Sequence, residues 1–400
     1  MIKRQAYLDK LHKLCDQNII KIITGVRRSG KSTLFKQFQQ ELIDSGIKPK
    51  HIISLNLEEM ENEALLERHV LNDYIMRIAD EGAKNYIFLD EIQKVPEFEK
   101  LVDSLYAKDF IDLYITGSNA YMLSSELATF LSGRYIEIKI LPFSFAEYFG
   151  GSDGNSSELF ARYMETGGMP EVLNLINAGA KSEVDDYLRS VYQTVLERDI
   201  TQKKQIRNKA DFEVVLKFTT DSIGSLISPN KIATRLSEQK NIVNKTTVDS
   251  YLLALVDSFV FYKAERYDIK GRNILQTLNK YYLVDTGFIR ILLGKDSNID
   301  RGHILENIVY LELLRRHAAV WVGKVDQKEV DFVVRTESGD TEYYQVSETI
   351  NGEQAREREL APFDKIRNHN AKYLLTLDAG SETYNGVKRL YVVDWLLGSL

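Results

Sequence analysis

The chain has 400 residues, which is enough for two to four domains of ordinary size. Hydrophobic residues make up 44% and charged residues 28%, a balance typical of globular proteins with sizeable cores, and the formal net charge is −6. This charge excludes a protein that coats nucleic acid through bulk positive charge, although it is compatible with a local basic face.

Cysteine content and hydropathy indicate the compartment. The single cysteine, Cys15, excludes an internal disulfide and favours a reducing environment, so we expect a cytoplasmic protein. Residues 1–14 lack the apolar core of a secretory signal. The most apolar stretch, 251–262, is too short to span a bilayer and contains Asp257, so no membrane association is expected.

Residues 25–33 read GVRRSGKST and fit G-x-x-x-x-G-K-[ST], the pattern of a phosphate-binding loop. The apolar run 19–24 before it predicts a buried strand, and apolar residues at helical spacing in 33–45 predict a helix after it. Strand, glycine-rich loop and helix in this order form the context that such a loop requires. The alternative is a chance match to the pattern.

The residue types of this loop suit a nucleotide bound with Mg²⁺. Gly25 and Gly30 allow the backbone to curl so that its N–H groups point at phosphates, and the helix N-terminus adds its positive dipole end. Lys31 supplies a positive charge to the β- and γ-phosphates, and Ser32 offers a hydroxyl to Mg²⁺. The candidate nucleotide-binding residues of the loop are Gly25, Arg28, Ser29, Gly30, Lys31, Ser32 and Thr33.

An acidic pair follows another predicted strand. Residues 85–91 read NYIFLDE, so four apolar residues lead into Asp90 and Glu91. At the end of a buried strand beside the phosphate loop, Asp90 can hold Mg²⁺ through water, and Glu91 can polarise an attacking water. The alternative is an acidic pair that merely ends a strand.

Two further positions are candidates for contact with the γ-phosphate. Ser118 and Asn119 follow the predicted strand 112–116, where they would face the phosphate from the side; the alternative is an ordinary turn. Arg134 could reach a γ-phosphate in its own chain or in a neighbouring one, because its guanidinium is always charged. A structural salt bridge is the alternative for Arg134.

The first 150 residues are predicted to form a P-loop NTPase domain with a doubly wound α/β fold and a parallel sheet. The acidic pair lies on a different strand from the phosphate loop, which suits the branch of these enzymes that uses a catalytic glutamate. The expected strands are 19–24, 51–57, 85–91, 112–116 and 134–141.

The middle of the chain predicts two helical domains. Residues 151–205 fit a helical lid, and 206–290 fit a winged helix with three helices and a β-ribbon whose wing is 268–280. The third helix, 246–259, carries Asp249 and Asp257 and no Lys or Arg, which argues against ordinary base reading. Contact with DNA phosphates is the alternative to a domain that packs or transmits nucleotide state.

Residues 291–400 contain Glu306, Asp331, Gln345 and Ser347, an order that resembles the restriction-endonuclease-like nuclease core. In that chemistry Asp and Glu bind Mg²⁺ and a lysine helps to activate water. Because Ser347 stands at the lysine position, we expect this fold without nuclease activity; Lys328 is a candidate substitute. The charged run 356–359 is predicted to be a solvated face.

Several motifs in chain order resemble a large prokaryotic family of AAA-type ATPases that carry a C-terminal domain of unknown function. They are GVRRSGKST, YIFLDEIQKV, ITGSNAYML, LSGRY, LPFSFAEYF, the lid string GGMPE at 167–171 and KYYLVDTG at 280–287. The resemblance covers nearly the whole chain. It implies ATP binding at 25–33, with Asp90 and Glu91 in their usual roles, and it puts Gly168 and Pro170 near the adenine.

We therefore expect Mg²⁺-dependent binding and hydrolysis of ATP, coupled to an unknown protein partner. The alternatives are a nucleotide-gated switch with negligible turnover and a DNA-acting ATPase or nuclease that uses the winged helix. A homo-oligomer is compatible with the sequence, which does not say whether the chain forms a ring.

Overall fold

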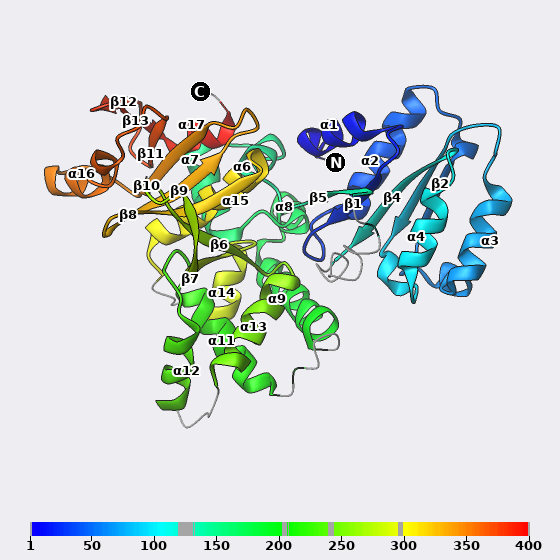
Figure 1. Ribbon diagram of the computed structural model, residues 1–400, viewed down its shortest axis with the longest axis horizontal. Coiled ribbons are helices and arrows are strands. Elements are labelled where there is room, and N and C mark those ends of the chain that lie inside the picture. The colour runs from blue at the N-terminus through cyan, green and yellow to red at the C-terminus, as the bar shows by residue number, and fades with distance from the viewer. Residues whose placement is uncertain are drawn as a thin grey trace. The chain divides into compact units, whose positions relative to one another are not determined.

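The computed structural model describes residues 2–118, 131, 133–201, 206, 208–238, 244–294 and 299–398 (Figure 1). They group into two compact units. The first comprises residues 1–140 with 257–259, and the second comprises 141–256 with 260–400. Within the described residues, no helix combines the length and the apolar character that crossing a membrane requires.

The first unit is built on an all-parallel sheet in the order β2–β3–β4–β1–β5. The strands are β1 (Ile20–Thr24), β2 (Ile52–Asn56), β3 (Asn85–Asp90), β4 (Ile111–Gly117) and β5 (Tyr135–Lys139). All five expected strands are confirmed to within two residues of their predicted ends. Since the strands are parallel, their carboxyl ends lie at one edge of the sheet.

Helices cover both faces of this sheet, which confirms the doubly wound α/β prediction. They are α1 (Gln5–Leu14), α2 (Lys31–Asp44), α3 (Arg68–Ile78) and α4 (Phe98–Tyr106), with short 3₁₀ turns at Pro49–His51, Met60–Leu65 and Ile92–Lys94. Alternate residues of β3 point to opposite faces. Phe88 packs in a core with residues of α1 and α2, whereas Leu89 packs in a core with residues of α3 and α4.

The second unit contains a mixed sheet in the order β12–β13–β11–β10–β9–β8–β6–β7. Its strands are β6 (Phe261–Asp268), β7 (Asn273–Leu283), β8 (Ala319–Val325), β9 (Lys328–Arg335), β10 (Thr341–Ser347), β11 (Lys372–Thr376), β12 (Glu382–Tyr384) and β13 (Val387–Tyr391). The sheet therefore spans two of the predicted domains.

The helices of this unit fall into three groups along the chain. The first is α6 (Phe145–Gly150), α7 (Ser156–Thr166), α8 (Pro170–Asn177), α9 (Val184–Thr194) and a π-helix (Val195–Thr201), with a 3₁₀ turn at Lys181–Glu183. The second is α11 (Lys209–Asp221), α12 (Pro229–Glu238) and α13 (Lys245–Asp257). The third is α14 (Gly287–Leu293), α15 (Arg301–Arg316), α16 (Glu353–Leu360) and α17 (Val392–Leu397), with a 3₁₀ turn at Phe363–Lys365.

The three helices and the ribbon expected of a winged helix are present as α11–α13 and the antiparallel pair β6–β7 (Figure 1). The wing predicted at 268–280 is wrong for most of its length, because strand β7 begins at Asn273. The ribbon is also not separate from the C-terminal domain, since β6 pairs in parallel with β8. A winged-helix identity for 206–290 stays a prediction.

Candidate nucleotide-binding site

The phosphate loop has the backbone conformation that an anion requires. Gly25, Arg28 and Gly30 all have positive φ, at +151°, +68° and +99° respectively. A side chain at Gly25 would collide with the carbonyl oxygen of Ile140, so only glycine fits there. Helix α2 begins at Lys31, and its N-cap is Gly30, which has no side chain to cap the first N–H groups. The helix N-terminus is thus suited to bind phosphate.

A buried hydroxyl within the loop and an arginine outside it add to this arrangement. The hydroxyl of Ser29 is buried and has no hydrogen-bond partner among the described residues, so it is a polar atom for which a ligand can provide the missing bond. Arg4, at the start of α1, donates from its guanidinium to the carbonyl oxygen of Ser29 at 3.1 Å. Sequence reasoning missed Arg4, because no motif connects it to the loop.

Lys31 is buried over the loop and faces the acidic pair. Its amine donates to the carbonyl oxygens of Gly25 at 3.0 Å and Val26 at 3.2 Å, and lies 4.0 Å from a carboxylate oxygen of Glu91. These partners come from β1's loop and from the end of β3. The structure therefore brings the predicted lysine and the predicted glutamate together at the carboxyl edge of the sheet.

Asp90 and Glu91 are both buried at that edge. Burial raises the pKa of Asp90, although hydrogen bonds from Ser32 and Thr116 oppose the shift. A buried carboxylate beside a serine hydroxyl fits a divalent cation, which would favour the charged form. The positive-φ backbone of the loop and the Ser29 hydroxyl, which has no partner among the described residues, suit phosphate. The oxygens of Ser32 and Asp90 suit Mg²⁺, so the site as a whole fits a nucleotide with Mg²⁺.

Three polar side chains hold the acidic pair in position. Thr116, on β4, donates to Asp90 and accepts the backbone N–H of Glu91 at 3.0 Å. Ser118 donates to the Glu91 carboxylate at 3.2 Å, and Gln93 donates to the same oxygen. Ser118 thus lies against the glutamate, and its contact with a γ-phosphate stays a prediction. The sequence analysis missed Thr116 and Gln93, although the position of Thr116 near the end of β4 is a usable signal.

Arg134 does not reach the phosphate loop of its own chain, and that part of the prediction is wrong. It precedes β5, and its carbonyl oxygen accepts the N–H of Ile20 at the amino end of β1. The loop lies at the opposite end, five residues away along β1, or about 16 Å. Arg134 instead pairs with Asp103 of α4. A role in a neighbouring chain stays a prediction, and Asn119 lies outside the described residues.

The lid string containing Pro170 lies in the second unit, where Pro170 is the first residue of α8. The buried carboxylate of Asp285 accepts the N–H groups of Gly168 at 2.7 Å and Gly287 at 2.9 Å. Any side chain at Gly167 would collide with this carboxylate. The strings GGMPE and KYYLVDTG therefore meet. Contact of Pro170 with adenine stays a prediction.

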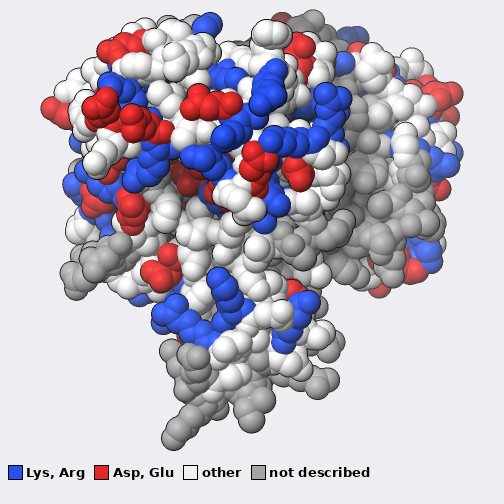
Figure 2. All heavy atoms as spheres, turned by 60° about the vertical axis from the view of Figure 1, so that its left-hand side comes forward, with Lys and Arg blue, Asp and Glu red and all other residues white. Residues whose placement is uncertain are grey.

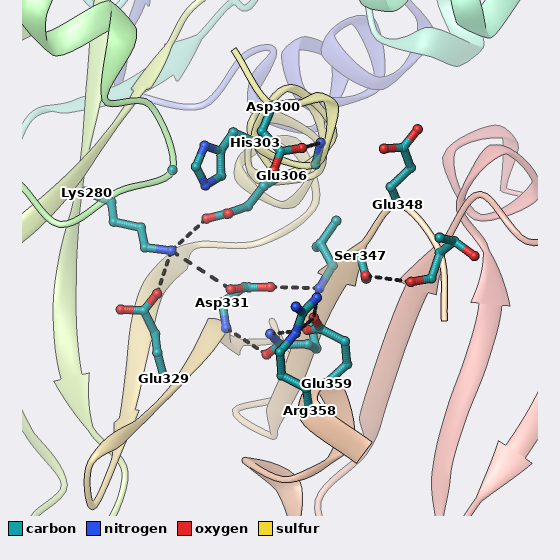
Figure 3. A pocket seen from close by; sticks show the side chains of 15 residues that line it. Lys280, Asp300, His303, Glu306, Glu329, Asp331, Ser347, Glu348, Arg358 and Glu359 are labelled. Carbon is teal, nitrogen blue, oxygen red and sulfur yellow. Dashed lines mark hydrogen bonds and ion pairs between the residues drawn. The ribbon is translucent and has the colours of Figure 1, made fainter. Parts of the chain in front are cut away.

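The C-terminal residues singled out by the sequence also converge. Glu306, Asp331, Gln345 and Ser347 line one pocket, whose volume is about 420 Å³ (Figure 3). Lys328 is exposed at the start of β9 and does not line it. The charged run 356–359 was predicted to be a solvated face. This prediction is wrong for Glu359, which is buried in the pocket wall.

Comparison with known proteins identifies relatives over the whole length. Residues 17–149 match a family described as an AAA domain, and 157–298 match a domain of unknown function. An uncharacterised protein of Haemophilus influenzae is 36% identical over 404 residues, 99% of each chain. An uncharacterised protein of Methanocaldococcus jannaschii is 29% identical, over 91% of this chain and 84% of that protein.

A solved structure agrees on the fold. The Walker-type ATPase of Pyrococcus abyssi superposes with a TM-score of 0.53 and 15% identity, covering 73% of this chain and 96% of that one. At this identity the likeness concerns the fold alone. Together with the full-length relative and the matched AAA domain, the findings show that the chain belongs to a family of AAA-type P-loop ATPases in which a domain of unknown function follows the AAA domain.

Proposed function

We propose that this chain binds ATP with Mg²⁺ at the phosphate loop and hydrolyses it, and that its nucleotide state is transmitted to a protein partner. The observation that carries the proposal is the convergence of Lys31, Asp90 and Glu91, which come from α2 and β3, at one edge of the parallel sheet. Family membership supports nucleotide binding.

Each residue has a role that its surroundings support. The Lys31 amine donates to the backbone carbonyls of Gly25 and Val26 and lies 4.0 Å from Glu91, and it can exchange these contacts for phosphate oxygens. Ser32 and Asp90 are the residues that would hold Mg²⁺, which when bound neutralises charge on the phosphates. Glu91 orients the attacking water, and Ser118 fixes its carboxylate.

The division into domains belongs to the same proposal: an ATPase core at 1–150, a helical lid at 151–205, a winged helix at 206–290 and a nuclease-like domain at 291–400. The helices α7–α9 support a lid, and the pocket around Asp331 supports the nuclease-like assignment. The shared sheet of β6–β13 implies that the last two domains move together.

The decisive experiment compares Mg²⁺-dependent ATP turnover by the purified chain with that of Glu91→Gln. We expect the variant to bind ATP and to turn it over at least about tenfold more slowly, because groups that position or deprotonate water contribute about 10²–10⁴ in rate. Glu63→Gln is the matched control, since Glu63 is exposed. Equal turnover in Glu91→Gln and wild type would remove Glu91 from the mechanism.

A nucleotide-gated switch is the second candidate. It is favoured by the contacts within the site, in which loop carbonyls accept from Lys31 while Ser118 and Gln93 donate to Glu91. A nucleotide whose phosphates replace the carbonyl partners of Lys31 changes the site even without turnover. Turnover no faster than that of Glu91→Gln, together with a large ATP-dependent change in assembly or shape, would establish the switch.

Action on DNA is tested by adding duplex DNA to the same assay. Figure 2 shows Lys and Arg side chains interspersed with Asp and Glu over the described residues of one face. Stimulation of turnover by DNA, with binding that weakens steeply as salt rises, would support a phosphate contact by the predicted winged helix. Turnover indifferent to DNA would point to a protein partner.

A further inference from the structure

The pocket in the second unit contains a buried lysine side chain. It lies among β7, α15, β9, β10 and α16 and is lined by six carboxylates, two basic side chains and several polar groups (Figure 3). The basic groups are Lys280 and Arg358. Lys280 comes from β7, in the string KYYLVDTG, and its side chain is only 4% exposed. The sequence analysis gave this lysine no role in the pocket.

Three carboxylates converge on the Lys280 amine from two elements. The nitrogen lies 2.6 Å from Glu329 Oε1 and 3.9 Å from Asp331 Oδ1, both on β9, and 2.9 Å from Glu306 Oε1 on α15. The hydroxyl of Tyr282 donates to the same Glu306 oxygen at 2.5 Å. A lysine amine is ordinarily an ammonium group, and three carboxylates within 4 Å match its positive charge.

The groups that would bind a metal in a nuclease-like site are already engaged. Asp331 Oδ2 accepts the N–H of Val346 at 2.8 Å, and its other oxygen faces Lys280. Gln345 accepts the N–H of Asp331 at 3.3 Å and donates to Glu359 at 3.0 Å. An ammonium and a divalent cation cannot share this space, because two positive charges a few ångströms apart repel strongly where water is excluded. The residues therefore do not fit a resident Mg²⁺.

We propose that Lys280 is the built-in cation of this pocket and takes the place of the divalent metal ion that the nuclease-like fold would otherwise hold. Serine at position 347 then follows naturally, because a metal-free site has no bound water for a lysine there to activate. The amine instead fastens β7 to α15 and β9. Losing it leaves three converging carboxylates, which form an oxygen-rich site that suits a divalent metal ion.

The test measures Mn²⁺ binding and thermal unfolding of the full chain without nucleotide. Wild type should show no Asp331-dependent Mn²⁺ binding, and its unfolding temperature should be the same in Mn²⁺ and in EDTA. Lys280→Met should unfold at a lower temperature in EDTA, recover with Mn²⁺ and bind Mn²⁺ at least tenfold more tightly than wild type. The additional change Asp331→Asn should remove that gain. Lys328→Met, which alters an exposed lysine on β9, is the matched control and should behave as wild type.

Two results would overturn the proposal. One is Mn²⁺ binding, or Mn²⁺-dependent cleavage of DNA or RNA, by wild type that Asp331→Asn abolishes. The other is a folded Lys280→Met variant that gains no Mn²⁺ binding. If Lys280→Met does not fold, Lys280→Met with Glu329→Gln replaces it, because it removes one of the three carboxylates that lose their cation and leaves the pair Glu306 and Asp331 for the metal. Neither readout depends on ATP turnover, so failure of the ATPase proposal leaves this test intact.

Discussion

Replacing Gly25 with alanine tests the geometry of the phosphate loop directly. A Cβ atom there would come within 3.0 Å of the Ile140 carbonyl oxygen, closer than real Cβ atoms lie, and within 3.2 Å of Ser29 Oγ. Both neighbours belong to the first unit: Ile140 directly follows β5, where its N–H bonds to Thr24, and Ser29 is in the loop itself. The loop must therefore move, by about 1 Å, to accept one methyl group.

The control for this change is Gly46→Ala. Gly46 also has positive φ, at +103°, but a Cβ atom there meets nothing within 4 Å. It should cost only the backbone strain of an L-residue in that conformation, about 1–2 kcal/mol. Gly25→Ala adds a steric conflict in a packed site, worth about 1–3 kcal/mol more. The difference between the two variants isolates the collision with Ile140.

Binding of a fluorescent ATP analogue and thermal unfolding should be measured on both variants. Gly25→Ala should bind at least about 100-fold more weakly, since a displacement of about 1 Å in a positioned site costs on that order. Gly46→Ala should retain wild-type affinity. The reasoning would be refuted by a Gly25→Ala variant that is as stable as Gly46→Ala and binds the analogue normally.

Three further substitutions test other buried contacts. Ser118→Ala should slow ATP turnover about tenfold with unchanged nucleotide affinity, because it removes the hydrogen bond to Glu91; unchanged turnover would contradict this. Lys21→Met should destabilise by about 3–5 kcal/mol in chemical unfolding, since it leaves Asp112 buried without its cation, and replacing both should recover most of the loss. Burial raises the pKa of Asp285 to about 7 against backbone N–H bonds that lower it, so the folded state binds the extra proton. The stability that this bound proton contributes to the folded state is present at low pH and is lost as the pH rises through 7. Relative to Asp285→Asn, the free energy of unfolding of wild type should fall by roughly 3 kcal/mol between pH 5 and pH 8.

The first sheet could be predicted because each buried strand is a short apolar run. All residues of β1, β3 and β4 are buried, so their sequence shows the signal of a parallel strand without needing its partners. The β6–β8 pairing is different, because it joins Arg266 to Val322 across a long separation that local periodicity does not encode. Polar residues such as Asn273 and Asn279 also made β7 look like a wing.

The functional residues also divide into those that a local motif reveals and those whose position depends on distant parts of the chain. Lys31 and Glu91 were found because each belongs to a local motif at a strand end. Arg134 was misplaced through an avoidable error: it precedes its strand, so in a parallel sheet it must lie at the edge opposite the loop. Lys280 could not be found, because Glu306, its partner on α15, is 26 residues away and a lysine on a strand carries no signature of burial.

The string KYYLVDTG at 280–287 links the pocket to the lid string at 167–171. Lys280 at its start holds the carboxylates of the pocket, and Asp285 near its end holds the lid string at Gly168. Helix α15 connects the same two regions a second time. Its Glu306 pairs with Lys280 in the pocket, and its Arg315 donates to the carbonyl oxygen of Pro142, near the start of the second unit, at 2.7 Å. If the proposed lid at 151–205 moved away from α15, it would have to break these bonds or carry the pocket with it. A lysine bound through the chain itself makes that connection permanent, whereas an exchangeable metal ion would make it depend on the supply of metal.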